Sequence, residues 1–185
     1  MSTLPVFVTG NAKKAEYLSR FLGLELEHQG VELEEIQSTD LEHIASYKAK
    51  QAYAALSKPV LVEDVAMGYT ELDGLPGAFI KFFVEQDNGF EKICRMGDGL
   101  ASRQAIAWSV FAYYDGQTMR LFRGSLKGTI AQHSSGIERF GWDCIFCPDG
   151  YNGLTRSELS EADNEKTYKQ IKPLDEIREF LTSLE

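Results

Sequence analysis

The chain has 185 residues, a formal net charge of −9 and 43% hydrophobic residues. This length is enough for one domain with a sizeable core, and the composition is that of an ordinary globular protein. We therefore predict a single domain over residues 1–185. The acidic balance argues against nucleic acid as a partner, because no surplus of Lys and Arg is available to displace counterions from a phosphate backbone. The acidic balance does not argue against binding of one small polyanion, because a local binding site is enough for that.

Cysteine use and hydropathy indicate a cytoplasmic protein with no membrane partner. No apolar run approaches the ~20 residues of a membrane span, and the first residues lack the charged and apolar regions of a signal peptide. Cys94, Cys144 and Cys147 form the small, odd set expected in a reducing compartment. Cys144 and Cys147 do make a C-x-x-C, but no second cysteine pair or histidine cluster completes a zinc site.

The first chemical feature is a polar loop between a strand and a helix. Residues 4–8 are rich in β-formers, and a helical pattern ends at Gly23. In between, Thr9 and Asn11 supply hydrogen-bonding side chains, and Lys13 or Lys14 supplies a positive charge at the helix start, where backbone amides are free. A phosphate chain suits such a loop. However, the loop is not a Walker A or G-x-G-x-x-G motif, and an ordinary strand-to-helix turn explains it equally well.

An acidic segment and a second helix follow. Residues 32–36 are expected to form an edge strand or an extended loop. Thr39 and Glu42 have the spacing of a capping box, which predicts a helix start. Lys48 lies at the edge of the predicted buried face and can reach into a cleft. That buried face is formed by small and apolar residues: Leu41, Ile44, Ala45, Ala49, Ala52 and Leu56.

Residues 60–65 place two carboxylates at the end of a buried strand. Three apolar β-formers run directly into Glu63 and Asp64, and we expect a loop to begin at about Met67. Adjacent carboxylates repel each other and are costly to desolvate unless a cation offsets them. Taken alone, this pattern fits either a metal site or a solvated acidic turn.

The second half of the chain predicts a constrained turn, a long hairpin and a terminal helix. Gly74 and Gly77 flank a proline, and Lys81 follows on an amphipathic helix. Residues 90–96 read as a short helix. Residues 104–114 and 117–127 read as two strands joined at Asp115-Gly116, which should extend the sheet into a second lobe. Residues 174–184 form an amphipathic helix.

An aromatic block lies between the hairpin and the last helix. Phe140 and Trp142 flank Gly141, and Asp143 follows them. A stacking aromatic beside polar backbone is what a nucleobase site requires. A buried aromatic corner in front of a strand is the alternative explanation.

Four blocks in this order resemble the inosine triphosphatase, or Ham1-like, family of non-canonical purine NTP pyrophosphatases. They are residues 9–14, 59–64, 74–77 with 80–81, and 140–143 with 148–151. The resemblance implies an elongated α/β fold with a mixed β-sheet, flanking helices and two lobes around a central nucleotide-binding cleft, in a homodimer. It also implies Mg²⁺-dependent hydrolysis of nucleoside triphosphates such as ITP, dITP and XTP to the monophosphate and pyrophosphate, which cleans the nucleotide pool.

The resemblance also implies roles for individual residues. Glu35, Glu63 and Asp64 would bind Mg²⁺. Asp64 and Lys14 would be catalytic, with Asp64 as metal ligand or as base toward the attacking water. The implied substrate-binding residues are Thr9, Gly10, Asn11, Lys14, Lys48, Lys81, Phe140, Gly141, Trp142 and Asp143.

The chain departs from the family in its late base-reading block. The family carries Lys-Asn and then Ser-His-Arg, and neither an ungapped count from the last helix nor a two-residue shift finds Ser-His-Arg here. Lys169, Gln170 or Lys172 could supply donors to a 6-oxo group, although a lysine does not reproduce arginine's bidentate fork. Two alternatives stay open: a pyrophosphatase with altered base preference, and a nucleotide-binding protein without turnover, which the retained acidic residues disfavour.

Overall fold

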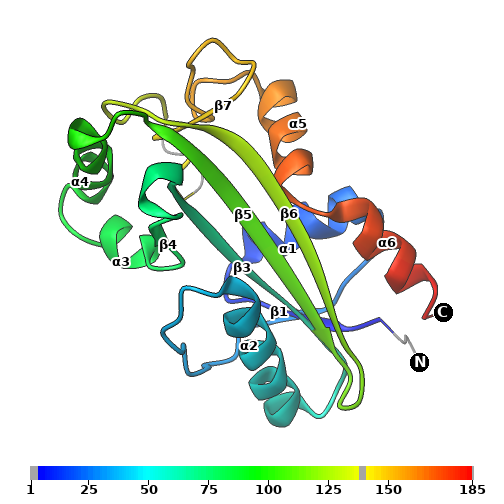
Figure 1. Cartoon of the computed structure of the whole chain (residues 1–185). Coiled ribbons are helices and arrows are strands. Elements are labelled where there is room, and N and C mark those ends of the chain that lie inside the picture. The colour runs from blue at the N-terminus through cyan, green and yellow to red at the C-terminus, as the bar shows by residue number, and fades with distance from the viewer. Residues whose placement is uncertain (1–3, 138–140, 185) are drawn as a thin grey trace. The chain divides into compact units, whose positions relative to one another are not determined.

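The structure, a computed structural model, describes residues 4–137 and 141–184. Over these residues it is a mixed α/β fold with seven strands in one sheet and six α-helices (Figure 1). The strands are β1 (Val6–Val8), β2 (His28–Gln29), β3 (Val60–Tyr69), β4 (Pro76–Gly77), β5 (Gln104–Tyr114), β6 (Met119–Ile130) and β7 (Phe146–Pro148). The α-helices are α1 (Ala12–Leu22), α2 (Leu41–Leu56), α3 (Ile80–Val84), α4 (Gly89–Met96), α5 (Glu161–Ile171) and α6 (Leu174–Thr182). None of the helices within these ranges is long and apolar enough to cross a membrane.

The sheet places the end of β1 beside the acidic part of β3. The strand order is β2-β1-β3-β5-β6-β7, and β4 pairs with β3. Strand β1 is parallel to both β2 and β3, with Val6 opposite Val60 and Phe7 opposite Leu61. Strand β1 ends at Val8, whereas β3 continues. Glu63 and the residues after it therefore extend past the carboxyl end of β1, where parallel α/β sheets bind ligands.

The chain divides into two compact units that are each built from separate segments. Unit 1 comprises the chain up to Asp64, the segment Ser109–Arg123 and the chain from Lys172 onward. Unit 2 comprises Val65–Trp108 and Gly124–Ile171. The long strands β3, β5 and β6 contribute residues to both units.

In unit 1, helices cover both faces of the strands. Helix α2 packs its small residues Ala45, Ala49 and Ala52 against the valines of β1 and β3, and these alanines are fully buried. Their small side chains let the helix approach the sheet closely. The alternate residues face the other way, where Phe7 stacks on Phe111 with ring centroids 6.4 Å apart. Helices α1 and α6 contact each other on that side (Figure 1).

Unit 2 has its own core, formed by the far ends of the long strands with α3, α4 and α5. The Tyr69 hydroxyl is fully buried and donates to the carbonyl of Ile93 at 2.8 Å. At Gly68 a Cβ would lie only 1.7 Å from the carbonyl oxygen of Gly74, so the pairing of β3 with β4 requires glycine there. The three cysteines within the described residues are buried, and none of them is in a disulfide bond.

Several local predictions are confirmed. Gly23 caps α1 with a φ of 66° and donates its amide to the carbonyl of Ser19. The hairpin of β5 and β6 turns at the predicted Asp115-Gly116. The last helix is present as α6. Residues 32–36 form no strand and correspond to the extended loop.

Two local predictions are wrong, and one helix was not predicted. The cap of α2 is Asp40 and not Thr39, since the Asp40 carboxylate accepts from the amides of Glu42 and His43. Strand β3 does not stop near Met67 but runs to Tyr69, because β4 pairs with its last residues. Helix α5 is not predicted by the sequence, because it buries only Thr167 and Ile171 and so lacks a clear apolar stripe.

Candidate functional site

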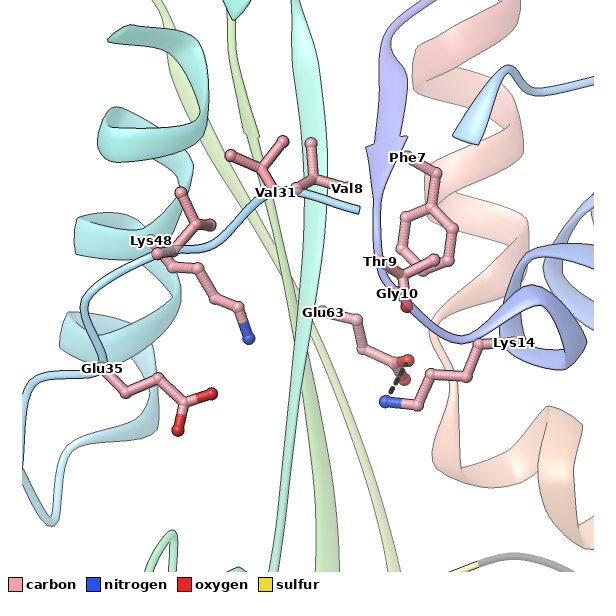
Figure 2. Close-up of a pocket in the computed structure, with 10 residues that line it drawn as sticks. Phe7, Val8, Thr9, Gly10, Lys14, Val31, Glu35, Lys48 and Glu63 are labelled. Atoms are coloured by element: carbon pink, nitrogen blue, oxygen red, sulfur yellow. Dashed lines mark ion pairs between the residues drawn. The ribbon is translucent and has the colours of Figure 1, made fainter. Parts of the chain in front are cut away.

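A pocket in unit 1 opens at the carboxyl end of β1. Ten residues from β1, α1, the loop after β2, α2 and β3 line it: Phe7, Val8, Thr9, Gly10, Lys14, Val31, Leu33, Glu35, Lys48 and Glu63. Figure 2 shows Lys48 and Glu35 reaching in from one side and Lys14 from the other. The lining combines four apolar residues, Phe7, Val8, Val31 and Leu33, with two lysines and two carboxylates. Six of the predicted site residues therefore meet at one place: Thr9, Gly10, Lys14, Glu35, Lys48 and Glu63.

The loop from β1 to α1 is held by its own side chains. The Thr9 hydroxyl accepts from the amide of Asn11 at 3.1 Å. Asn11 caps α1, with its side-chain oxygen accepting from the amide of Lys14 at 3.2 Å. Gly10, between them, is exposed, and a Cβ there would meet nothing within 4 Å. The loop thus presents accessible backbone and the positive end of a helix to the pocket, which suits an anion.

Glu63 is a buried carboxylate held by two lysines. Its side chain is 3% exposed. It accepts a hydrogen bond from Lys172 and one from the Ser109 hydroxyl at 3.2 Å, and it pairs with Lys14 at 3.3 Å. Burial raises its pKa, but the charges of Lys14 and Lys172 oppose this and bring the pKa of Glu63 to about 2. Glu63 is consequently ionised at any physiological pH.

Asp64 has one paired and one unpaired oxygen. Its Oδ1 accepts from the Lys48 ammonium at 2.8 Å. Its Oδ2 is buried and has no hydrogen-bond partner among the described residues. Burial raises the pKa of Asp64, and the nearby Lys48 only partly opposes that rise. A buried carboxylate oxygen that lacks a partner is costly unless a ligand or cation completes it.

The three predicted metal ligands are not gathered into one cluster. Within the described residues, no group of three His, Cys, Asp or Glu side chains is arranged to hold a metal ion. Consecutive residues of a strand face opposite sides of the sheet, so Glu63 contacts Lys14 of α1 while Asp64 contacts Lys48 of α2. Glu35 lies in the pocket wall on the loop before α2.

The predicted base-binding block lies in unit 2. Phe140 is outside the described residues. Gly141 is in the left-handed region, with a φ of 49°. Trp142 is 8% exposed and packs edge-on against Phe146, with ring centroids 5.6 Å apart. Trp142 therefore matches the alternative explanation, a buried aromatic corner.

Asp143 is engaged by an arginine. The two side chains are 5% and 6% exposed, and Nη1 of Arg156 lies 2.5 Å from Oδ1 of Asp143. Arg156 also donates to the hydroxyl of Thr167 at 3.1 Å. The side-chain amide of Asn164 donates to the backbone carbonyl of Arg156 at 2.8 Å. This carboxylate is thus already neutralised inside unit 2.

The two remaining predicted lysines are also in unit 2. Lys81 is exposed on α3, and Lys169 is exposed on α5.

Two residues of these networks, Ser109 and Arg156, are not predicted by the sequence. Lys172 is a predicted candidate donor to a purine base, but its ammonium lies on Glu63. Lys172 is 109 positions from Glu63 in the chain, and no local spacing links them. Arg156 stands between Thr155 and Ser157 in a turn, without periodicity. One signal was available for Glu63: a carboxylate predicted to be buried needs a cation, and the sequence supplies several lysines as candidates.

Comparison with known proteins gives consistent matches over nearly the whole chain. Residues 5–180 match the Ham1 family. The chain is 40% identical over 181 residues to the inosine triphosphate pyrophosphatase of Yarrowia lipolytica, covering 95% of this chain and 94% of that protein. It is 38% identical over 188 residues to the protein of the same name from Saccharomyces cerevisiae, with the same two coverages.

Solved structures share the fold. The HAM1 protein of Coxiella burnetii superposes with a TM-score of 0.83 at 22% identity, covering 96% of this chain and 98% of that one. A Mycobacterium abscessus protein described as a nucleoside-triphosphatase or dITP/XTP pyrophosphatase gives a TM-score of 0.74 at 23% identity, covering 90% of this chain and 94% of that one. At these identities the likeness supports the α/β fold.

Proposed function

The chain belongs to the Ham1 family, and from that premise we propose that it hydrolyses non-canonical purine nucleoside triphosphates such as ITP, dITP and XTP to the monophosphate and pyrophosphate. The names of its relatives, at up to 40% identity over most of both chains, support the reaction. The observation that carries it is the pocket of unit 1, where a helix start, Lys14 and Lys48 face the carboxylates of Glu35 and Glu63.

In this proposal the pocket binds the triphosphate. Within it, the backbone of the loop at Gly10 and the start of α1 face the phosphates. The Asn11 cap fixes the geometry of that backbone. Lys14 and Lys48 are about a fifth to a quarter exposed, so their ammonium groups can reach a ligand. Together they offset the negative charge of the triphosphate, which an acidic protein would otherwise repel.

We propose Mg²⁺ as the cofactor, and the donors of the site suit it. Mg²⁺ prefers carboxylate oxygens, and Glu35 and Glu63, which line the pocket, supply oxygens of that type. When bound, Mg²⁺ offsets phosphate charge and polarises the bond that is cleaved. Glu63 supplies a carboxylate that is always ionised, because the nearby lysines lower its pKa.

Asp64 is proposed as the general base. Burial raises its pKa, which increases its affinity for a proton. Its Oδ1 is oriented by Lys48 while Oδ2 is left to accept the proton of the attacking water. Proton acceptance at Oδ2 also removes a charge that burial makes unfavourable.

An altered base preference is the second candidate, and the Asp143–Arg156 pair favours it. Because Arg156 neutralises the charge of Asp143, this carboxylate is a weaker acceptor for a hydrogen bond from a purine base. Lys172, one of the possible substitutes for the family's base-reading residues, is committed to Glu63. Lys169 remains the proposed donor on α5. We also propose that the protein is cytoplasmic and that it forms a homodimer. Light scattering of the purified protein tests the dimer.

The function is tested with purified protein, Mg²⁺ and a panel of ITP, XTP, dITP, GTP, ATP and dUTP. We expect pyrophosphate release, with ITP, dITP and XTP preferred. Comparable rates on GTP or ATP would instead support the altered base preference. Binding of nucleotides without pyrophosphate release from any of them would favour the binding protein without turnover and overturn the enzymatic proposal.

A further inference from the structure

The two lysines on Glu63 are in different environments. Lys14 lines the pocket, and its side chain is 24% exposed. Lys172 is not among the pocket-lining residues, and its side chain is 7% exposed. Both ammonium groups contact the same carboxylate, Lys172 through Oε1 and Lys14 through Oε2. One cation is thus accessible to a ligand and the other is not.

Lys172 is fixed on several sides. Besides Glu63, its ammonium lies 3.5 Å from the Ser109 hydroxyl and 5.8 Å from the centroid of the Phe111 ring. Its carbonyl accepts from the amide of Leu174 at the start of α6. Glu63, Ser109 and Lys172 come from three separate segments of unit 1. The buried contact therefore joins all three segments, and it cannot move without disturbing each of them.

We propose that Lys172 is a positioning residue that stays on Glu63 as a permanent counter-ion, so that Lys14 can leave Glu63 for the phosphates of the incoming nucleotide. This inference rests on the proposed function and assigns a division of labour within its site. Lys172 touches neither substrate nor reacting atoms. It acts only through Glu63.

The physical reason is the cost of a buried charge without a partner. If Lys14 were the only cation on Glu63, its transfer to a phosphate would leave an ionised carboxylate buried and unpaired, which is strongly unfavourable. That cost would be subtracted from the affinity for the nucleotide. With Lys172 in place, Glu63 keeps one charge-assisted hydrogen bond and the one from Ser109 after Lys14 has moved.

The test measures binding of tripolyphosphate in EDTA by calorimetry, so that neither metal nor base recognition contributes. Lys172→Met should weaken binding about tenfold, because Glu63 then retains Lys14. Lys172→Arg, which keeps the cation, should stay within about threefold of the parent. Lys127→Met, an exposed lysine of β6, serves as the matched control and should change nothing.

A double variant separates positioning from general damage. In Glu63→Gln/Lys172→Met the charge that retains Lys14 is absent, so tripolyphosphate affinity should return to the parental value or exceed it. A merely structural role for Lys172 predicts no such rescue. Parental affinity in Lys172→Met, or a double variant as weak as the single one, overturns the inference.

A measurement on the unaltered protein covers the case in which Lys172→Met does not fold. The lysine ammonium groups are followed by ¹⁵N NMR, with the signals assigned through Lys172→Arg and Lys14→Arg. Tripolyphosphate should shift the Lys14 signal and leave the Lys172 signal in place. A shifted Lys172 signal, or no tripolyphosphate binding by the parent, overturns the inference. Nucleotide hydrolysis is measured separately, so its absence would count against the proposed function alone.

Discussion

The two units bury carboxylates in opposite ways. In unit 1, Glu63 and Asp64 pair with Lys14 and Lys48, whose side chains are 24% and 21% exposed and line a pocket. In unit 2, Asp143 pairs with an arginine that is 6% exposed and is held further by Thr167 and Asn164. Lysine is a flexible point charge, whereas arginine fixes several hydrogen bonds at once.

The difference teaches that burial alone does not identify a reactive carboxylate. The unit 1 pairs can exchange partners, because a ligand can reach one side of each pair. The unit 2 pair is enclosed, so its contribution is to the stability of the fold. Substitutions in the first set should therefore alter turnover and binding, and substitutions in the second should alter the free energy of unfolding.

The largest effect is expected from Asp64→Asn. The amide cannot accept the proton of the attacking water, so kcat for ITP should fall a hundredfold or more, on the order of what general bases contribute. Pyrophosphate release measures it, and nucleotide affinity should persist. Asp87→Asn, at an exposed turn, is the control of equal size. Turnover within a factor of about two of the parent would contradict Asp64 as the base.

Removal of the enclosed cation should destabilise unit 2. Arg156→Met leaves Asp143 buried without its arginine, which should lower the free energy of unfolding by about 3 kcal/mol. Urea denaturation followed by circular dichroism measures the change. The double variant Asp143→Asn/Arg156→Met should regain part of the loss, since it removes the buried charge. An unchanged midpoint in Arg156→Met would show that the pair is not a stabilising element.

A lysine of the pocket should behave differently from this arginine. Lys48→Met should raise KM for ITP about tenfold, because one phosphate contact is lost. The free energy of unfolding should fall by less than in Arg156→Met, since the side chains of Lys48 and Asp64 are 21% and 19% exposed. Lys50→Met, exposed on the same helix, is the matched control. If Lys48→Met instead lowered stability as much as Arg156→Met, the contrast between the units would fail.

The smallest effect concerns a partly exposed carboxylate of unit 2, Glu91. The Ser134 amide and hydroxyl bring the pKa of Glu91 to about 2. This lies below the value of about 4.3 for an unfolded chain, so the stabilisation is present above about pH 5 and is lost as the pH falls toward 2. After allowance for solvent screening, Glu91→Gln should cost about 0.5 kcal/mol at pH 7 and less at pH 3.

Chemical denaturation at the two pH values measures this, with Glu85→Gln as an exposed control. A cost for Glu91→Gln that grew on acidification would show that the sign of the pKa shift is wrong.

Local features of this fold were predictable because short-range physics determines them. The strand, loop and helix at residues 4–23 follow from β-formers, small polar residues and a glycine cap. The hairpin follows from Asp115-Gly116. These patterns depend only on neighbouring residues in the chain. The six predicted site residues that line the pocket were predicted from such local patterns or from the family resemblance.

The remaining features depend on contacts between distant segments. The length of β3 is determined by its pairing with β4, and nothing near Met67 signals it. The role of Lys172 depends on Glu63, which is 109 residues away. The enclosure of Asp143 depends on Arg156, a residue in a turn. In each case the partner that decides the outcome could not be chosen from the sequence around the residue itself.

The discontinuity of unit 1 has a consequence for protein synthesis. The segment from Lys172 onward is translated after the other two segments of unit 1, and it supplies both α6 and the second cation of Glu63. Until then the nascent chain holds Glu63 with, at most, one of its two lysines. The pair of counter-ions on Glu63 is therefore complete only after Lys172 has been translated, so unit 1 matures late and its α6-facing surface stays uncovered until then.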